Sequence, residues 1–333
     1  MSSHPRALRT RPFLRRMMWA GTELSRRLGL PIVKPLVGET LDVSGLADMP
    51  SLVLTEDGAR PLCELYASDP ARFLKDPSGF DRFPLLVKRI DAGADLSIQV
   101  HPDDQAALQY EREPNGKSEA WVVLAAEDDA RVWLGCRQDV APEAVAEALV
   151  QGRIEAALCS LPVKKGDVIP VPAGCVHAIG GGIMIFEVQQ PSNVTYRLFD
   201  YNREEKNLET GEMRLRPLHH EPGLKVIKTQ LETGLARPRA LEVRDGWHRD
   251  RLCDMGQFQI DRLQLTTEGE LRPGGLAALQ VTEGRLVVSD AVDAYCLEEG
   301  DSLILPELLT QVLLRPLLRP TTALLALHPP TGA

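Results

Sequence analysis

Apolar and polar residues alternate in short runs along most of the chain, and glycines and prolines separate these runs. Such alternation is typical of β-strands with one buried face, and the separating residues favour turns. The sequence predicts strands at 83–90, 96–100, 120–126, 131–135, 167–172, 183–190 and 194–201.

Helical patterns are fewer than strand patterns. Residues 69–76 and 103–112 are predicted as short helices, with Asp103 and Asp104 as the cap of the second. Residues 141–161 (APEAVAEALVQGRIEAALCSL) are predicted as the one long helix, because Pro142 suits a first helical turn. Many strands and few helices predict a mainly β fold of barrels or sandwiches, with a small helical insertion near 141–161.

An internal repeat indicates how the strands are organised. The segment KKGDVIPVPAGCVHAI (164–179) aligns with LEEGDSLILPELLTQVLL (297–314). The alignment pairs Gly166 with Gly300, Asp167 with Asp301, Pro172 with Pro306 and His177 with Gln311. Gly-Asp favours a tight turn into a strand, and the repeat fits two copies of a jelly-roll barrel. We therefore expect a first domain at 1–235, which contains the helical insertion, and a second domain at 236–333.

Composition and charge narrow the choice of partners. The 333 residues are 44% hydrophobic and 26% charged, as in soluble globular proteins. A net charge of −9 argues against nucleic acid or an anionic membrane as partner, although a few local cations suffice to bind an anionic small molecule. Six scattered cysteines without a C-x-x-C pair suit reduced thiols, and Arg and Pro residues interrupt the apolar stretch at 308–330 too early for a membrane span. These features predict a cytoplasmic protein.

Four residues with metal-binding side chains lie at the ends of predicted strands: Gln99, His101, Glu119 and His177. A barrel brings such strand ends together, so the four side chains can converge on one cation. Two imidazoles and a carboxylate suit Zn²⁺ and leave a position open, as in catalytic rather than structural zinc sites. Taken singly, each residue is better explained by capping, a loop hydrogen bond or hydration. Taken together within a barrel, they favour a metal site.

Four segments, LSIQVHPDD, GKSEAW, VPAGCVHAIGGG and QQPSNVTYRLFDYNR, resemble in order and spacing the signatures of the short bacterial form of type I mannose-6-phosphate isomerases. The resemblance is strong over 83–203, extends to 7–30, and is architectural after 219. It implies a zinc-dependent cupin enzyme that interconverts mannose 6-phosphate and fructose 6-phosphate. It also implies one Zn²⁺ per chain held by Gln99, His101, Glu119 and His177.

The same resemblance implies an active-site arginine at Arg197 and a motif lysine at Lys117. The family's Trp-Gly-Gly is Trp-Ala-Gly at 19–21 here, and Leu41 stands where a Trp is expected. These two departures fall in segments that help to wall the pocket in the family. The resemblance therefore implies the metal ligands more directly than the substrate.

An aldose–ketose isomerisation removes a proton next to a carbonyl and returns it to the neighbouring carbon through an enediol. Glu187 is our candidate for the base, because strand alternation can turn it toward the cavity that His177 lines; the alternative is a carboxylate that faces solvent. Lys117 would shuttle the hydroxyl proton or stabilise the enediolate, and Arg197 would brace the open-chain sugar or its phosphate. The alternative for both cations is a surface charge.

Two other functions stay open at this point. One is a non-catalytic metal-binding cupin that senses a sugar phosphate, and the other is a zinc cupin isomerase acting on another sugar. Lys117, Glu187 and Arg197 argue against the first, because a protein that only binds needs no base. The sequence contains neither phosphate-loop motif of nucleotide-dependent enzymes.

The second copy of the repeat lacks the donors of the first. Gln311 stands in the place of His177, and the strand predicted at 276–290 offers only Gln280, Glu283 and Asp290 as donors. A site without imidazole or thiolate suits Zn²⁺ poorly. We therefore expect the second barrel to be free of metal and to bury apolar surface against the first.

Overall fold

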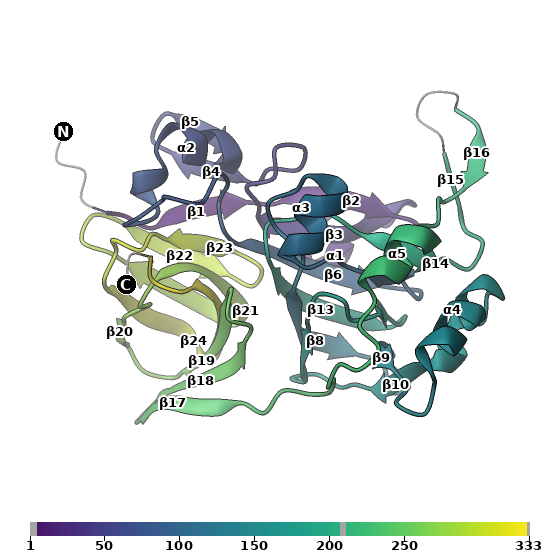
Figure 1. Cartoon of the computed structure of the whole chain (residues 1–333). Coiled ribbons are helices and arrows are strands. Elements are labelled where there is room, and N and C mark those ends of the chain that lie inside the picture. The colour runs from purple at the N-terminus through teal and green to yellow at the C-terminus, as the bar shows by residue number, and fades with distance from the viewer. Residues whose placement is uncertain (1–4, 207–210, 332–333) are drawn as a thin grey trace.

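The strands of the first barrel form two sheets that pack face to face (Figure 1). The computed structural model describes residues 5–206 and 211–331. One sheet contains, in spatial order, β11 (Val168–Val171), β8 (Glu119–Ala126), β13 (Ile183–Gln189), β6 (Leu86–Ala92), β3 (Leu36–Val43) and β2 (Phe13–Met17). The other contains β10 (Leu158–Pro162), β9 (Arg131–Cys136), β12 (His177–Ile179), β7 (Ile98–Val100) and β14 (Tyr196–Phe199).

The second barrel is one strongly curled sheet. Its order is β17 (Arg239–Arg244), β18 (Trp247–Asp254), β19 (Gln259–Leu265), β24 (Val312–His328), β21 (Leu276–Ser289), β23 (Ser302–Leu305), β1 (Leu8–Arg11), β4 (Leu52–Thr55) and β5 (Gly58–Pro61). Strand β20 (Gly269–Leu271) pairs with β24, and β22 (Ala294–Glu298) pairs with β21. The mainly β prediction, with two barrels and few helices, is confirmed.

The N-terminal strand belongs to the second barrel rather than to the first. Leu8 of β1 pairs with Ile304 of β23, and Thr10 pairs with Val53 of β4. Figure 1 shows this purple strand lying along the yellow-green barrel. We propose that 235/236 separates the two barrels, with three N-terminal strands added to the second sheet.

The predicted repeat corresponds to the same turn in both barrels. Gly166 and Gly300 have φ of +92° and +89°, a region that favours glycine. The Asp167 carboxylate accepts from the backbone N–H of Lys164 at 2.9 Å, and the Asp301 carboxylate accepts from that of Glu298 at 2.9 Å. Each turn leads into a strand that ends at a proline, as the alignment predicted.

Three apolar clusters account for most of the core. One fills the first barrel around Trp121, a second fills the second barrel around Leu279, and a third lies between the barrels. The third includes Val122 and Phe186 from the first barrel together with Ile260 and Leu324 from the second. Strands β8 and β13 are therefore buried on both faces, which explains their nearly continuous apolar sequence.

The helices are short and lie outside the barrels (Figure 1). They are α1 (Glu23–Arg27), α2 (Leu62–Ser68), α3 (Asp104–Glu111), α4 (Pro142–Val150) and α5 (His220–Val226), with 3₁₀ turns η1 (Pro70–Arg72) and η2 (Ile154–Ala157). A small hairpin of β15 (Glu204–Lys206) and β16 (Met213–Leu215) projects from the first barrel. The side chain of Asp103 accepts from the N–H of Ala106 at 3.0 Å, so the predicted cap of α3 is confirmed.

The predicted long helix at 141–161 is wrong. Helix α4 ends at Val150 because Gly152 takes φ +65° and closes the last turn. The N–H of Gly152 donates to the carbonyl of Leu149, and that of Arg153 donates to Ala148, which is the Schellman ending of a helix. The chain continues through η2 into strand β10, so the insertion is one helix of nine residues.

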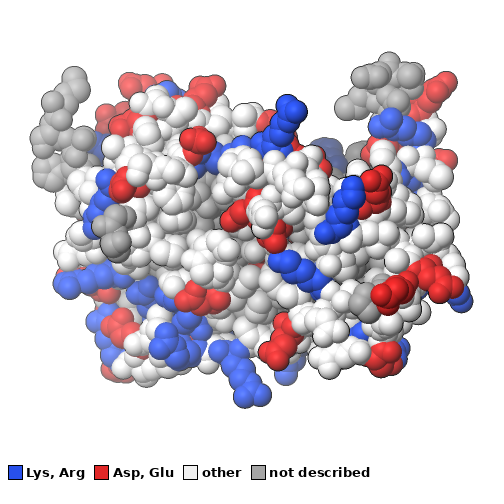
Figure 2. All heavy atoms as spheres, viewed as in Figure 1, with Lys and Arg blue, Asp and Glu red and all other residues white. Residues whose placement is uncertain are grey.

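Charged side chains of both signs are interspersed over the face shown in Figure 2. Within the described residues, every helix is too short or too polar to span a membrane.

Candidate metal centre

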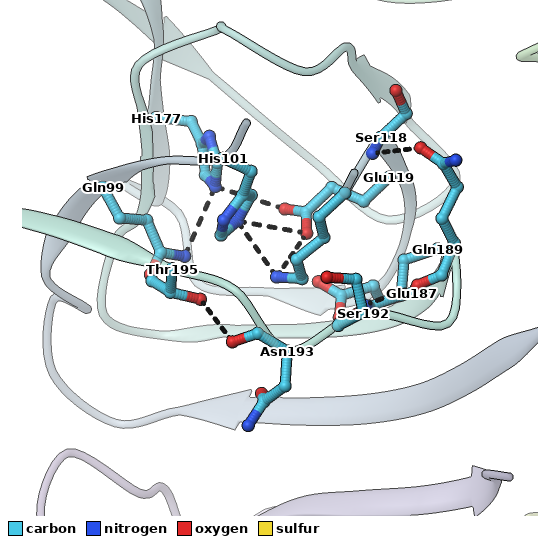
Figure 3. A network of polar contacts seen from close by, with 12 residues as sticks. Gln99, His101, Ser118, Glu119, His177, Glu187, Gln189, Ser192, Asn193 and Thr195 are labelled. Carbon is cyan, nitrogen blue, oxygen red and sulfur yellow. Dashed lines mark hydrogen bonds and ion pairs between the residues drawn. The ribbon is translucent and has the colours of Figure 1, made fainter. Parts of the chain in front are cut away.

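Strand ends from both sheets of the first barrel deliver the four predicted ligands to one place. Gln99 of β7 and His177 of β12 are directly paired across adjacent strands. His101 directly follows β7, and Glu119 is the first residue of β8 in the opposite sheet. Figure 3 shows His101, His177 and Glu119 pointing toward one another, with Gln99 beside His177.

The donor atoms of this group are spaced for one small cation. The Nε2 atom of His177 lies 3.2 Å from Glu119 Oε1, and that of His101 lies 3.5 Å from Glu119 Oε2. Zinc bonds of about 2.0–2.1 Å at tetrahedral angles place neighbouring ligand atoms about 3.3 Å apart. The Gln99 Nε2 atom lies 3.3 Å from His177 Nε2, and a half-turn of the amide presents its oxygen instead. Among the described residues, His101, Glu119 and His177 form the one cluster of three or more His, Cys, Asp or Glu donors close enough to hold a metal ion.

Hydrogen bonds from the other ring nitrogens fix both imidazoles. His101 Nδ1 lies 2.9 Å from the carbonyl of Val194, and His177 Nδ1 lies 2.9 Å from the carbonyl of Cys175. A carbonyl only accepts, so Nδ1 carries the proton in each ring and the Nε2 lone pair faces the centre. This is the tautomer that binds a metal through Nε2.

Protonation states at the centre also suit a cation. Burial, together with the charge of Lys117, holds the pKa of His101 well below its usual value, so the ring is neutral. Burial opposes ionisation of Glu119, but the charge of Lys117 outweighs it and holds the pKa of Glu119 well below the usual value. Neutral imidazole and ionised carboxylate are the forms that ligate metals.

One contact tests whether the residues fit a cation. Lys117 Nζ lies 2.9 Å from Glu119 Oε2 and 3.0 Å from His101 Nε2. The donor atoms of the centre therefore already surround a positive charge. The site fits a divalent cation, and its nitrogen-rich donor set fits zinc.

Glu187 is buried beside this group, so the alternative of a solvent-facing carboxylate is wrong. It is 3% exposed, and its Oε1 atom lies 3.1 Å from Lys88 Nζ. Burial and the nearby charge of Glu119 raise its pKa above the usual value. The two carboxylates of the site therefore have their pKa values shifted in opposite directions, which is common where one binds charge and the other moves protons.

A polar cavity of about 260 Å³ opens next to the centre. Its walls include Gln99, Lys117, Glu187 and Arg197, which are four of the seven predicted site residues. Five cationic side chains and two carboxylates line it: Arg15, Lys88, Lys117, Arg197, Arg216, Glu39 and Glu187. In an acidic protein, this local excess of positive charge is suited to an anionic ligand.

Arg197 reaches the cavity from β14, where it is paired with Gln99 across the strands. Its Nη1 atom donates to the carbonyl of Pro217 at 2.9 Å, while its buried Nε has no hydrogen-bond partner. One N–H of the Arg197 guanidinium is therefore engaged, and the Nε–H remains free to donate to a ligand. Lys117 is 5% exposed, so the surface-charge alternative is wrong for this lysine.

The loop that carries Lys117 is fixed by a close backbone approach. A Cβ atom on Gly116 would lie 2.4 Å from the carbonyl carbon of Asp103, so only glycine fits there. The Asp104 carboxylate accepts from the N–H of Gly116 at 2.7 Å and from Gln190 Nε2 at 2.9 Å. The cap of α3 and the loop before β8 are thereby held together.

Two residues at the site were not predicted from the sequence. Lys88 and Trp121 lie inside strands that were assigned correctly, but nothing next to them in the sequence indicated a site. Leu41, at the position of the expected Trp, packs with Leu46, Met49 and Leu86. Trp19 of the Trp-Ala-Gly segment does line the cavity.

Comparisons with known proteins agree with this geometry. No family model matches the chain. The chain is 33% identical over 299 residues to the mannose-6-phosphate isomerase of Streptococcus mutans, covering 88% of this chain and 90% of that protein. The crystal structure of the mannose 6-phosphate isomerase from Bacillus subtilis superimposes with a TM-score of 0.85 at 26% identity, covering 96% of this chain and 99% of that one. A mannose 6-phosphate isomerase solved with zinc bound has the same fold, with a TM-score of 0.78 at 13% identity over 97% of this chain and 99% of that one.

Proposed function

We propose that this chain, which belongs to the mannose-6-phosphate isomerase family, interconverts mannose 6-phosphate and fructose 6-phosphate with one bound zinc ion. The observation that carries the proposal is a buried His/Glu/His centre beside a cavity that Gln99, Lys117, Glu187 and Arg197 line. The ligands would be His101, Glu119, His177 and Gln99. When bound, zinc supplies a Lewis acid that polarises the sugar carbonyl.

Glu187 is proposed as the base. In the open-chain aldose it takes the proton from C2 and returns it to C1, while one proton moves from the O2 hydroxyl to O1, so that the atoms balance. The raised pKa of Glu187 favours this exchange, because a carboxyl that is easily protonated both accepts and releases the proton. Its burial also keeps bulk water away from the enediol.

Lys117 and Arg197 are proposed to act on the substrate's oxygens. The Lys117 ammonium lies among the ligand atoms, where it can pass the hydroxyl proton or stabilise negative charge on O1 and O2. Neighbouring Glu119 and Glu187 outweigh burial and raise the pKa of Lys117, so it stays charged. Arg197 is proposed to hold the phosphate or the sugar chain through its free donors.

The test is a coupled assay that follows fructose 6-phosphate formed from mannose 6-phosphate. We expect activity that disappears after exhaustive chelation and returns with Zn²⁺. Activity indifferent to chelation contradicts the metal-dependent mechanism. A chain that binds zinc and mannose 6-phosphate without turnover identifies a sensor instead, and turnover only of a different sugar identifies another isomerase of the same fold.

A further inference from the structure

One indole N–H contacts both carboxylates of the site. Trp121 is fully buried, and its Nε1 atom lies 3.1 Å from Glu119 Oε1 and 3.0 Å from Glu187 Oε2. An indole has a single donor and no acceptor, so one hydrogen is shared between the metal-centre carboxylate and the carboxylate assigned as the base. This contact is not needed for the steps proposed above.

Strand geometry fixes this arrangement. Glu119 and Trp121 are two residues apart on β8 and so project from the same face. Glu187 lies directly opposite Trp121 on the neighbouring strand β13. On the other side, Ile169 of β11 is the register partner of Trp121, and the ring of His177 meets the indole edge-on with centroids 5.5 Å apart. The direction of the N–H is therefore set by packing.

Two carboxylates in a buried site repel each other, and a donor placed between them offsets part of that repulsion. We propose that Trp121 is a positioning residue whose N–H holds the base, Glu187, in a fixed place relative to the metal ligand, Glu119. Metal binding and proton transfer then depend on the same hydrogen atom. This inference rests on the proposed function.

The second barrel supplies an internal comparison. Its strand β21 pairs with β23 as β8 pairs with β11, with Ala277 opposite Leu305 where Glu119 is opposite Val171. In this register Leu279 corresponds to Trp121. The position is filled by an aliphatic side chain where no carboxylates are present, so packing alone does not require the indole.

The experiment replaces the tryptophan by 3-benzothienylalanine, which has a sulfur in place of the N–H and nearly the same shape. The same replacement at Trp247, which donates to Glu242 in the second barrel, is the matched control. Three quantities are measured on each chain: zinc affinity by competition with a chromophoric chelator, kcat on mannose 6-phosphate at saturating zinc, and the melting temperature without metal. Trp121→Phe serves as a second, genetically encoded variant.

We expect the replacement at position 121 to weaken zinc binding about 10-fold to 100-fold, the usual effect of removing an outer hydrogen bond to a ligand. Zinc occupancy does not limit the rate at saturating zinc. Under this condition we also expect kcat to fall at least about tenfold, because Glu187 loses the contact that fixes its position. The metal-free melting temperature falls modestly, because the donor between the two carboxylates is lost while the shape of the side chain is kept, and the control keeps the parent's zinc affinity and kcat.

Other outcomes overturn the proposal. Unchanged zinc affinity overturns it whatever the parent's activity, and a loss of only one of the two properties shows that the hydrogen is not shared in function. Failure of both variants to fold without metal assigns Trp121 to packing. An inactive parent that binds zinc contradicts the proposed function instead, and the zinc measurement still decides the contact with Glu119.

Discussion

Glu119 and Glu187 are both buried at the site and contact the same indole, yet their other neighbours suit them to different roles. Glu119 faces two imidazoles and the Lys117 ammonium, and the charge of the ammonium stabilises the carboxylate. Glu187 has Lys88 as its close cation, and the charge of Glu119 opposes its ionisation. A carboxylate that stays ionised is suited to hold a metal, and one that is readily protonated is suited to exchange a proton.

Parallel substitutions separate these two roles. We expect Glu119→Gln to lower zinc content, because a neutral amide is a poorer zinc ligand than a carboxylate. We expect Glu187→Gln to keep zinc and to lower kcat by about 10²–10⁴, the usual contribution of a positioned base. The measurement is elemental zinc and kcat on the same preparations. A Glu187→Gln chain with the parent's kcat shows that another group is the base.

Arg197 is expected to act on substrate rather than on the metal. Removing one charge-assisted contact costs about 1.5–3 kcal/mol, so Arg197→Ala should lower kcat/KM by roughly 10-fold to 100-fold with zinc retained. Arg197→Lys is the matched control, because it keeps the charge and loses the planar fork. Loss of zinc together with activity in the alanine variant assigns a structural role to the arginine.

Residues of the site differed in how visible they were in the sequence. His101 and His177 stand out at strand ends because imidazoles are scarce, and the four family-like segments placed them in order. The sequence did not identify Trp121 and Lys88 as site residues, because an indole or a lysine within a strand gives the same pattern whether it faces a site or a core. Only the cross-strand register, which is a tertiary property, brings them to Glu187.

Among the elements, the Gly-Asp turn before a strand was predicted twice and occurs twice. The helix predicted at 141–161 is too long, because the apolar periodicity continues past Gly152, whose positive φ ends the helix. The local signal was present, since glycine after a helical run favours termination. Helix α5 was not predicted, because seven residues that include a proline and a glycine have weak helical propensity.

The two copies of the turn give a matched test. Gly166→Ala and Gly300→Ala both force a residue with a Cβ into positive φ, which costs about 1–2 kcal/mol. A Cβ on Gly166 meets nothing within 4 Å, whereas one on Gly300 would lie 2.3 Å from Arg89 Nη1. Arg89 is held by Asp42 through contacts of 2.7 and 3.1 Å, so displacing it disturbs a buried ion pair.

Gly300→Ala is therefore expected to lower the free energy of unfolding by about 1–3 kcal/mol more than Gly166→Ala. Urea denaturation of both variants and the parent measures the difference. Equal losses contradict the role of Arg89. Zinc content should stay at the parent value in both variants, because neither glycine contacts the centre.

At the scale of the whole molecule, the barrels share an architecture, but the described residues of the second barrel offer no group of three His, Cys, Asp or Glu donors. In the register of the repeat, Ala277 and Gln311 stand where the first barrel has Glu119 and His177. Buried Gln280 donates to Ser302 at 2.8 Å, and Glu283 pairs with Lys165 of the first barrel. The Gln280 contact lies within the second barrel, and the Glu283 contact joins the two barrels.

We expect elemental analysis of the intact chain to give one zinc per polypeptide. His101→Ala should reduce this value toward zero, because the substitution removes an imidazole from the single centre. Zinc should also raise the melting temperature of the parent, since a ligand at 100 times its Kd adds about 2.7 kcal/mol to the free energy of unfolding. Two tightly held ions, with one surviving His101→Ala, contradict a metal-free second barrel.

The pairing of β1 with β23 has a consequence for biosynthesis. A ribosome makes Leu8 296 residues before its partner Ile304. Until Ile304 is made, this strand has one edge without its native neighbour, and exposed strand edges promote association between chains. Closure of the second sheet therefore waits for residue 304, whereas the strands that carry the metal ligands, up to residue 177, can pair while synthesis continues. Protease protection of stalled nascent chains should accordingly appear in the first barrel before it appears at Leu8.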